Sequence, residues 1–192
     1  MLNKNMRKEE IEQFLENKGD FVRIDHLSRF LKDNLTMDIK KYVAIKLGEL
    51  YDKKLMFSEA AKMYDIAAIF SIPFAEKIKY YTKEAELFIK TGAFDRADEA
   101  VRKAMVEAKE KERAEIYVSI KEFYKKQAQI FEKENRRSNS LKIYEKLLEM
   151  NLSGTERGEV KEKLLSLYEK TGKLKEYYEL KRGKLGIISQ RG

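Results

Sequence analysis

The sequence predicts an all-α fold built from stacked pairs of helices, and two observations support this class. The composition is 39% charged and 43% hydrophobic, with one Pro and nine Gly in 192 residues, so few residues are suited to loops. The second observation is a repeat of small and aromatic residues with the same offsets in two segments. Its members are Gly48, Tyr51, Ala60, Tyr64 and Ala67 in the first segment and Ala85, Phe88, Ala97, Val101 and Ala104 in the second. A repeat of this length and chemistry is typical of stacked helix pairs.

Three helices are expected up to the first aromatic of this repeat. The first covers about residues 6–17 and ends at Gly19, because glycine readily adopts the left-handed conformation after a helix. Asp20 can cap the second helix, which runs to about residue 31. The acidic Asp38 favours the start of the third helix, which continues to Tyr51.

The next three helices carry the repeat itself. Ser58 is expected to cap the fourth helix, whose small-residue face allows a close approach of two helix axes. Pro73 fits the first turn of the fifth helix, where a missing N–H costs little. This helix runs to about Lys90, Gly92 makes the turn, and Asp95 lies near the start of the sixth helix.

Four further helices are expected in the C-terminal half. The seventh begins near the charged run 107–113 and ends before a turn at 135–138, after which Ser138 or Asn139 caps the eighth. Thr155 can cap the ninth helix, and Gly172 repeats the turn at Gly92. The tenth helix extends to about Leu185, and residues 186–192 form a tail without periodicity.

Five large apolar residues act as anchors of the repeat, at Leu15, Tyr51, Phe88, Phe131 and Tyr168. Their spacings are 36, 37, 43 and 37 residues. Four residues beyond each anchor, where a tight turn between helices belongs, stand Gly19, Leu55, Gly92, Asn135 and Gly172. The pattern therefore predicts about five antiparallel helix pairs, or 9–10 helices, in a single domain over residues 1–185.

This pattern resembles the tetratricopeptide repeat, in which a small residue, an aromatic and a turn Gly precede Ala, aromatic and Ala. Residues 41–105 match it best and 112–185 match it more loosely, while the long helices and divergent spacing also resemble soluble NSF attachment proteins in architecture. The resemblance implies a right-handed α-solenoid that binds a partner along its concave face, which the first helix of each pair lines. The groove positions that it implies are Tyr42, Ile45, Glu49, Lys53, Lys79, Thr82, Glu86, Lys90, Glu122, Lys125, Gln129 and Lys133.

Four lysines share one position, two residues after an anchor aromatic: Lys53, Lys90, Lys133 and Lys170. Two interpretations stay open for them. Each lies near a helix C-terminus, where a cation stabilises the helix dipole by about 0.3–1 kcal/mol. On stacked helices they would also form a ladder able to bind carboxylates of a partner.

The net charge of +8 is unevenly distributed, since residues 111–192 hold +7 of it. A basic half can indicate an acidic partner or a nucleic acid, and an ordinary solvated helix surface is the alternative. The cations that would form a basic patch are Lys125, Lys126, Arg136, Arg137, Lys181 and Arg182.

No pattern predicts a reaction centre, so we expect a protein that is not an enzyme and that needs no metal or cofactor. The absence of Cys excludes thiol chemistry and disulfides. His26 is the single histidine, and we expect a boundary residue rather than a metal ligand. No apolar run approaches the roughly 18 residues of a membrane span, and no signal segment is recognisable, so we expect a cytoplasmic protein. The excess of Lys over Arg suits a heat-loving source, and an AT-rich genome would produce the same bias.

The favoured hypothesis is a non-catalytic scaffold or adaptor that binds another protein or an acidic peptide segment in the concave groove. The main alternative is an RNA- or DNA-binding repeat protein that uses the basic half, which predicts steeply salt-dependent binding. Self-association into a homo-oligomer through the terminal repeats is a further possibility, since terminal repeats need a polar capping face to stay monomeric.

Overall fold

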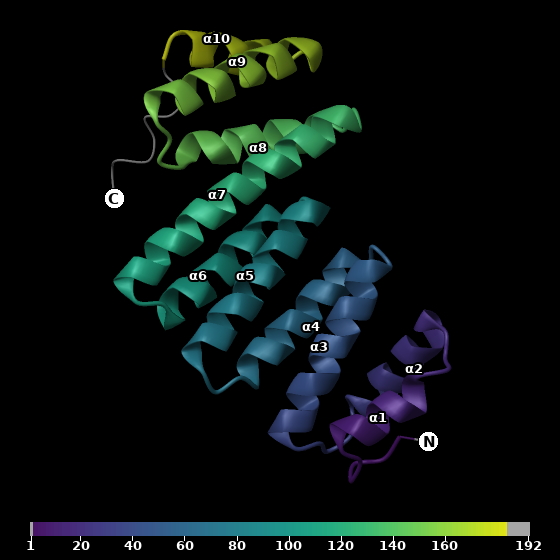
Figure 1. Ribbon diagram of the computed structural model, residues 1–192. Helices are drawn as coiled ribbons and strands as arrows, with labels where there is room; N and C mark the ends of the chain where they lie inside the picture. Colours follow the sequence, from purple (N-terminus) through teal and green to yellow (C-terminus); the bar gives the residue numbers. More distant parts are fainter. Residues whose placement is uncertain (1, 184–192) are drawn as a thin grey trace. The chain divides into compact units, whose positions relative to one another are not determined.

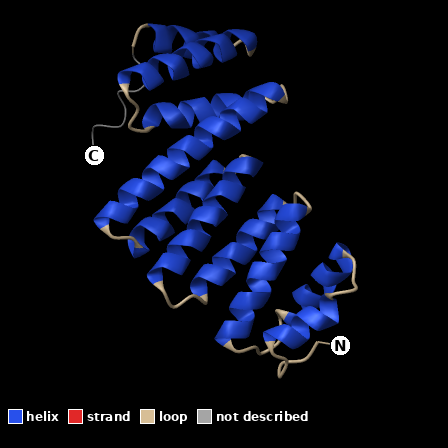
Figure 2. Ribbon diagram, viewed as in Figure 1, coloured by secondary structure: helices blue, strands red, loops and turns tan. Residues whose placement is uncertain are grey.

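The computed structural model describes residues 2–183, and this part of the chain is entirely helical (Figures 1 and 2). The all-α prediction is therefore confirmed, with ten helices in the described residues. Their bounds are α1 Lys8–Leu15, α2 Asp20–Phe30, α3 Met37–Lys53, α4 Phe57–Ile69, α5 Phe74–Thr91, α6 Phe94–Glu107, α7 Glu110–Lys133, α8 Arg137–Glu149, α9 Gly154–Lys170 and α10 Leu174–Lys181. None of these helices is both long enough and apolar enough to cross a membrane. The predicted end of the domain at Leu185 and the tail 186–192 lie outside the described residues.

The chain divides into two compact units, one up to Tyr117 and one from Val118 onward, so that the boundary falls inside α7. In the first unit each helix packs on its neighbours in the sequence, with α2 on α3, α3 on α4, α4 on α5 and α5 on α6 (Figure 1). In the second unit α8 packs on α9 and α9 on α10. A single domain over residues 1–185 stays a prediction.

Four turns between helices have the same backbone conformation. Leu55, Gly92, Asn135 and Gly172 have positive φ angles of 59°, 81°, 56° and 71°. The backbone N–H of the next residue donates to the carbonyl of the anchor aromatic over 2.8–3.0 Å in each turn. This pair of features is the Schellman motif, which satisfies the last carbonyls of a helix. The tight turns predicted four residues after the second to fifth anchors are confirmed, including the two without Gly.

The turn predicted at Gly19 is wrong. Gly19 has φ −66° and serves as the N-cap of α2, so it is not left-handed. Instead Arg23 donates from Nε to the Leu15 carbonyl (3.0 Å) and from Nη2 to the Glu16 carbonyl (2.7 Å). An arginine side chain thus satisfies the carbonyls at the end of α1 that a left-handed Gly would otherwise help to satisfy.

The predicted helix caps are wrong by one or two residues in several places. In each of the four left-handed turns, the residue directly after the left-handed residue is the N-cap of the following helix. These N-cap residues have φ of −82° to −87° and ψ of 63° to 66°. The side chains expected as caps, Asp20, Ser58, Ser138 and Asn139, therefore lie inside their helices. Thr155 also lies inside α9, because Ser153 caps that helix in a capping box with Glu156.

Small residues form the close contacts of the first unit. Ala60, Ala67, Ala85 and Ala97 are fully buried. A Cβ placed on Gly48 would lie 3.0 Å from the ring of Tyr64, so the backbone of α3 packs directly against this side chain. The second unit is filled by larger side chains, and Tyr124, Phe131, Ile143, Leu147, Leu164 and Tyr168 are fully buried in it.

Candidate partner-binding surface

The first helices of the predicted pairs carry two lysines each, five residues before and two residues after the anchor aromatic. A separation of seven residues is about two helical turns, so both lysines of a pair lie on one face. These lysine pairs are Lys46 and Lys53 on α3, Lys83 and Lys90 on α5, Lys126 and Lys133 on α7, and Lys163 and Lys170 on α9. The sequence prediction identified the second member of each pair. Of the first members it named only Lys126, as part of the basic patch, and it missed that this position recurs in the same register.

Carboxylates of the preceding elements neutralise several of these lysines. Asp52 at the end of α3 lies 3.0 Å from Lys83 and 3.4 Å from Lys90 on α5. Desolvation raises the pKa of Asp52, but Lys83 and Lys90 outweigh it and leave the pKa below its usual value. Lys53 lies 3.0 Å from Asp20. Two members of the predicted cation ladder, Lys53 and Lys90, are thus ion-paired within the chain.

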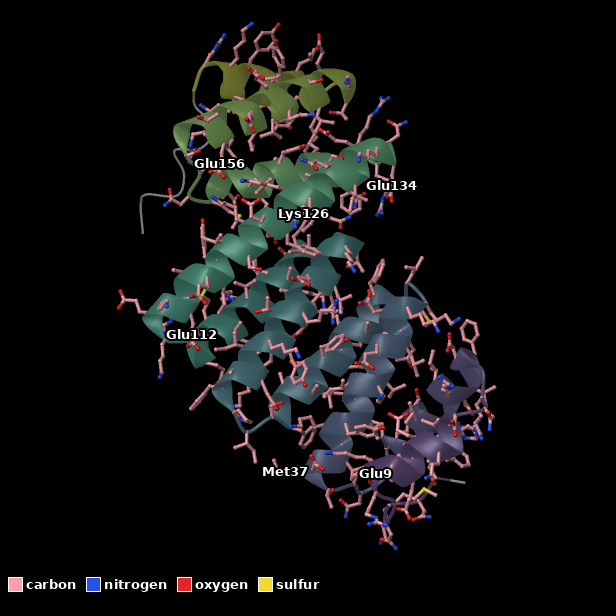
Figure 3. All side chains as sticks on the ribbon, in the orientation of Figure 1. Glu9, Met37, Glu112, Lys126, Glu134 and Glu156 are labelled. Atoms are coloured by element: carbon pink, nitrogen blue, oxygen red, sulfur yellow. The ribbon has the colours of Figure 1, made fainter. Side chains whose placement is uncertain are left out.

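A second set of ion pairs joins successive first helices at the N-terminus of the later helix. Lys41 on α3 lies 2.9 Å from Glu76 in the first turn of α5, and Lys121 on α7 lies 3.1 Å from Glu156 in the first turn of α9. Figure 3 labels Glu156 at the start of α9. Hydrogen bonds from Lys125, the Ser153 backbone and Lys121 lower the pKa of Glu156 to about 2. These pairs fix neighbouring first helices to each other in a defined register.

Two of the four predicted groove residues of α3 lie at a depression. An open groove of about 590 Å³ is formed by α1, α2 and α3, and Glu49 and Lys53 line it. Tyr42 donates a hydrogen bond from its hydroxyl to Glu12, which also pairs with Lys46 at 2.6 Å. Ile45 is half-buried and does not line this groove.

The predicted groove residues of α5 are less accessible. Lys79 is exposed, whereas Thr82, Glu86 and Lys90 are half-buried. The Thr82 hydroxyl has no hydrogen-bond partner. Lys90 lies over the Phe57 ring at 4.7 Å in addition to its contact with Asp52. Of the predicted groove residues of α5, Lys79 is therefore the most accessible.

The predicted residues of the second unit divide into bound and exposed cations. Lys125 is held by Glu122 at 2.7 Å and by Glu156. Lys126, which Figure 3 labels, is exposed on α7 together with Gln129 and Lys133. Lys126 and Lys133 form no ion pair with a described residue.

The remaining cations of the predicted basic patch stand at helix ends. Arg136 stacks over the Phe131 ring at 4.2 Å and pairs with Glu134 at 3.4 Å. Arg137 donates to Asn135 over 3.0 Å. Lys181 lies 5.7 Å from the Tyr177 ring centroid, and Arg182 is exposed. Each of Arg136, Arg137 and Lys181 is thus held by its own local contact. These contacts do not join the cations into one continuous basic surface.

His26 packs edge-on against the Phe14 ring at 5.1 Å and is half-buried, as expected for a boundary residue. Within residues 2–183 no three His, Cys, Asp or Glu side chains are placed to share a metal ion. Neither a scan against protein-family models nor a search of curated proteins gave a match to this chain.

Proposed function

We propose that this chain is a non-catalytic scaffold of the tetratricopeptide-like class, a right-handed α-solenoid of about five helix pairs that binds a segment of another protein. The observation that carries the proposal is the set of four equivalent turns, at Leu55, Gly92, Asn135 and Gly172. Turns with one conformation at spacings of 37, 43 and 37 residues are what repeated helical hairpins require.

The surface chemistry of the first helices supports a protein partner. The α1–α3 groove has apolar side chains at Leu15, Leu27 and Leu50. Charged side chains of both signs surround them, including Glu49 and Lys53. An apolar floor with a polar, charged rim is typical of protein interfaces and offers specificity through charge complementarity.

Site-specific crosslinking in the native host tests this proposal. A photoreactive residue in place of Glu49 is expected to crosslink to a protein, whereas the same residue in place of Lys142, which is exposed on α8, is expected not to. Lys53→Glu in the chain that carries the photoreactive residue at position 49 should remove the crosslinked species while the circular dichroism spectrum stays unchanged. If the residue at position 49 crosslinks only to a nucleic acid, seen as a product that nuclease removes, the proposal is contradicted.

The alternative function is binding of RNA or DNA by residues 118–183, and the exposed, unpaired Lys126 and Lys133 favour it. Filter binding of a labelled oligonucleotide at increasing salt tests it, because affinity must fall steeply if lysines release counterions from phosphates. No retention at low salt would exclude this alternative.

A further inference from the structure

A pocket of about 250 Å³ lies in the second unit, between the α7–α8 turn and the C-terminal half of α9. Three cations and one carboxylate line it, so its net charge is +2. The polar side chains that line the pocket are Glu132, Asn135, Arg137, Ser140, Lys163, Ser166 and Lys170. Because Glu132 pairs with Lys163 at 2.9 Å, the positive charge of Arg137 and Lys170 is left without compensation inside the pocket.

The two uncompensated cations are placed by different means. Asn135 occupies the left-handed position of the turn, and its Oδ1 accepts a hydrogen bond from Nε of Arg137 over 3.0 Å. This bond orients the guanidinium group and leaves its terminal N–H donors for a ligand. Lys170 is exposed in the last turn of α9 and forms no ion pair with a described residue.

The α1–α3 groove is lined by residues at the same offsets from their anchor aromatic as those of the α7–α9 pocket. Its composition shows that a net positive charge at these positions is not a general property of the fold. Lys46, Glu49 and Lys53 correspond there to Lys163, Ser166 and Lys170. The α1–α3 groove is electrically balanced, because its three cations face three carboxylates. These charged residues are Arg23, Lys46, Lys53, Glu12, Glu16 and Glu49.

The corresponding lysines of α5 are partly compensated, since the single carboxylate of Asp52 pairs with both Lys83 and Lys90. Of the three positions compared, the α7–α9 pocket is the one in which a serine stands in place of a glutamate and a lysine forms no ion pair with a described residue. On α7 the corresponding residues Lys126, Gln129 and Lys133 also lack a carboxylate. A concave site with an excess of two positive charges attracts anions.

We propose that this pocket binds a phosphate monoester dianion. A phosphorylated side chain carries about −1.5 to −2 charge at neutral pH and three acceptor oxygens, which match the net charge and the donors of the pocket. One guanidinium and two ammonium groups can bind such a group through charge-assisted hydrogen bonds. The volume corresponds to roughly eight water molecules, which is enough for one phosphate group.

The source of the phosphate group is a phosphoserine or phosphothreonine on the bound protein segment. This assignment of the source rests on the proposed function, whereas binding of the phosphate group itself does not. A small-molecule phosphate probe can therefore show whether the pocket binds phosphate even if the proposed protein partner is wrong.

Inorganic phosphate titrated into the full chain at constant ionic strength, followed by amide NMR, tests the pocket. The amide signals of Asn135, Arg137, Ser166 and Lys170 are expected to shift together with one dissociation constant. Arg137→Gln and Lys170→Gln should each weaken binding by about tenfold or more, the loss expected for one charge-assisted hydrogen bond.

The matched control is Lys142→Gln, which removes the same charge from an exposed position of α8 and should leave the affinity unchanged. Circular dichroism melting of each variant shows whether it folds. Equal effects of Lys142→Gln and Lys170→Gln, or displacement of phosphate by chloride at equal concentration, would overturn the proposal.

Competition experiments then distinguish the sources. A phosphoserine peptide should displace inorganic phosphate and its unphosphorylated form should not. If a short RNA displaces phosphate more effectively than the peptide, and Lys126→Gln weakens the RNA as much as Lys170→Gln does, the protein source is wrong and a nucleic acid occupies the surface.

Discussion

Replacing Glu84 by glutamine measures the energetic cost of a carboxyl group that is buried between α4, α5 and α6. Glu84 is 5% exposed, its Oε2 has no hydrogen-bond partner, and its Oε1 lies 3.5 Å from Lys103 Nζ. Lys103 is closer to Asp65, at 2.8 Å. Desolvation, and next the charge of Asp65, raise the pKa of Glu84 to about 7, while Lys103 opposes them and the more distant Glu99 adds to them.

The sign and size of the effect follow from proton linkage. The unfolded chain loses the proton of Glu84 near pH 4.5, whereas the folded protein keeps it until about pH 7. The folded state thus binds more protons across this window, and the free energy of unfolding falls as the pH rises. At about 1.4 kcal/mol for each unit of pKa, the total loss is roughly 3 kcal/mol. Glu84→Gln stays neutral and should avoid this loss.

The measurement is urea unfolding of wild type and Glu84→Gln at pH 5, 6, 7 and 8, followed by far-ultraviolet circular dichroism. The two proteins should be nearly equal at pH 5, and the variant should be more stable at pH 8 by up to about 3 kcal/mol. Hydrogen exchange of the α5 amides reports the same change for the first unit alone. Glu159→Gln, at an exposed position of α9, is the control and should give a difference that does not vary with pH. A Glu84→Gln variant that is less stable than wild type at pH 8 would show that the ion pair with Lys103 is stabilising and refute the reasoning.

Four substitutions at backbone positions give further predictions, each measured as a change in thermal midpoint. Gly48→Ala should lower stability by about 1–2 kcal/mol, because the new Cβ would lie 3.0 Å from the ring of the buried Tyr64. Gly158→Ala should raise stability by about 0.5–1 kcal/mol, since that helical position faces open space, and a loss there would contradict the account of both glycines. Leu55→Gly should raise stability by up to about 1 kcal/mol, because Leu55 has φ 59° and is 72% exposed. Asn135→Gly should change stability less, since asparagine tolerates this conformation, and an equal gain at both sites would argue against strain at Leu55.

The turns could be predicted from the sequence because they depend on local spacing. Leu55 does not suggest a left-handed turn by residue type, whereas Asn135 tolerates one, and the distance from the anchors placed both turns correctly. Gly19 has the favourable residue type and not the conformation, because Arg23 from the next helix binds the carbonyls at the end of α1. The Arg23 side chain, eight residues after Leu15, determines how α1 ends. The conformational propensity of Gly19 alone carries no information about this contact.

The surface could be predicted only in part. The register identified Lys53, Lys90, Lys133 and Lys170 as equivalent, but the ion pairs that Lys53 and Lys90 form depend on residues more than 30 positions earlier. Asp52 neutralises Lys90, whereas Lys170 meets no such partner. The availability of a lysine to a ligand therefore depends on the neighbouring helix as well as its own. The sequence of one helix does not predict it.

The ion pairs between successive first helices also affect how the chain folds. Lys41 and Glu76 are 35 positions apart, as are Lys121 and Glu156. A similar pair joins two second helices, since Lys103 on α6 and Asp65 on α4 are 38 positions apart. Each stabilising contact thus becomes available once one further hairpin has formed, and the loop that must close is short. Chains with such low contact order fold in microseconds to milliseconds and need no late, long-range docking step. A nascent chain of this protein can therefore fold in sequence order as each hairpin leaves the ribosome, before the C-terminal helices have been synthesised.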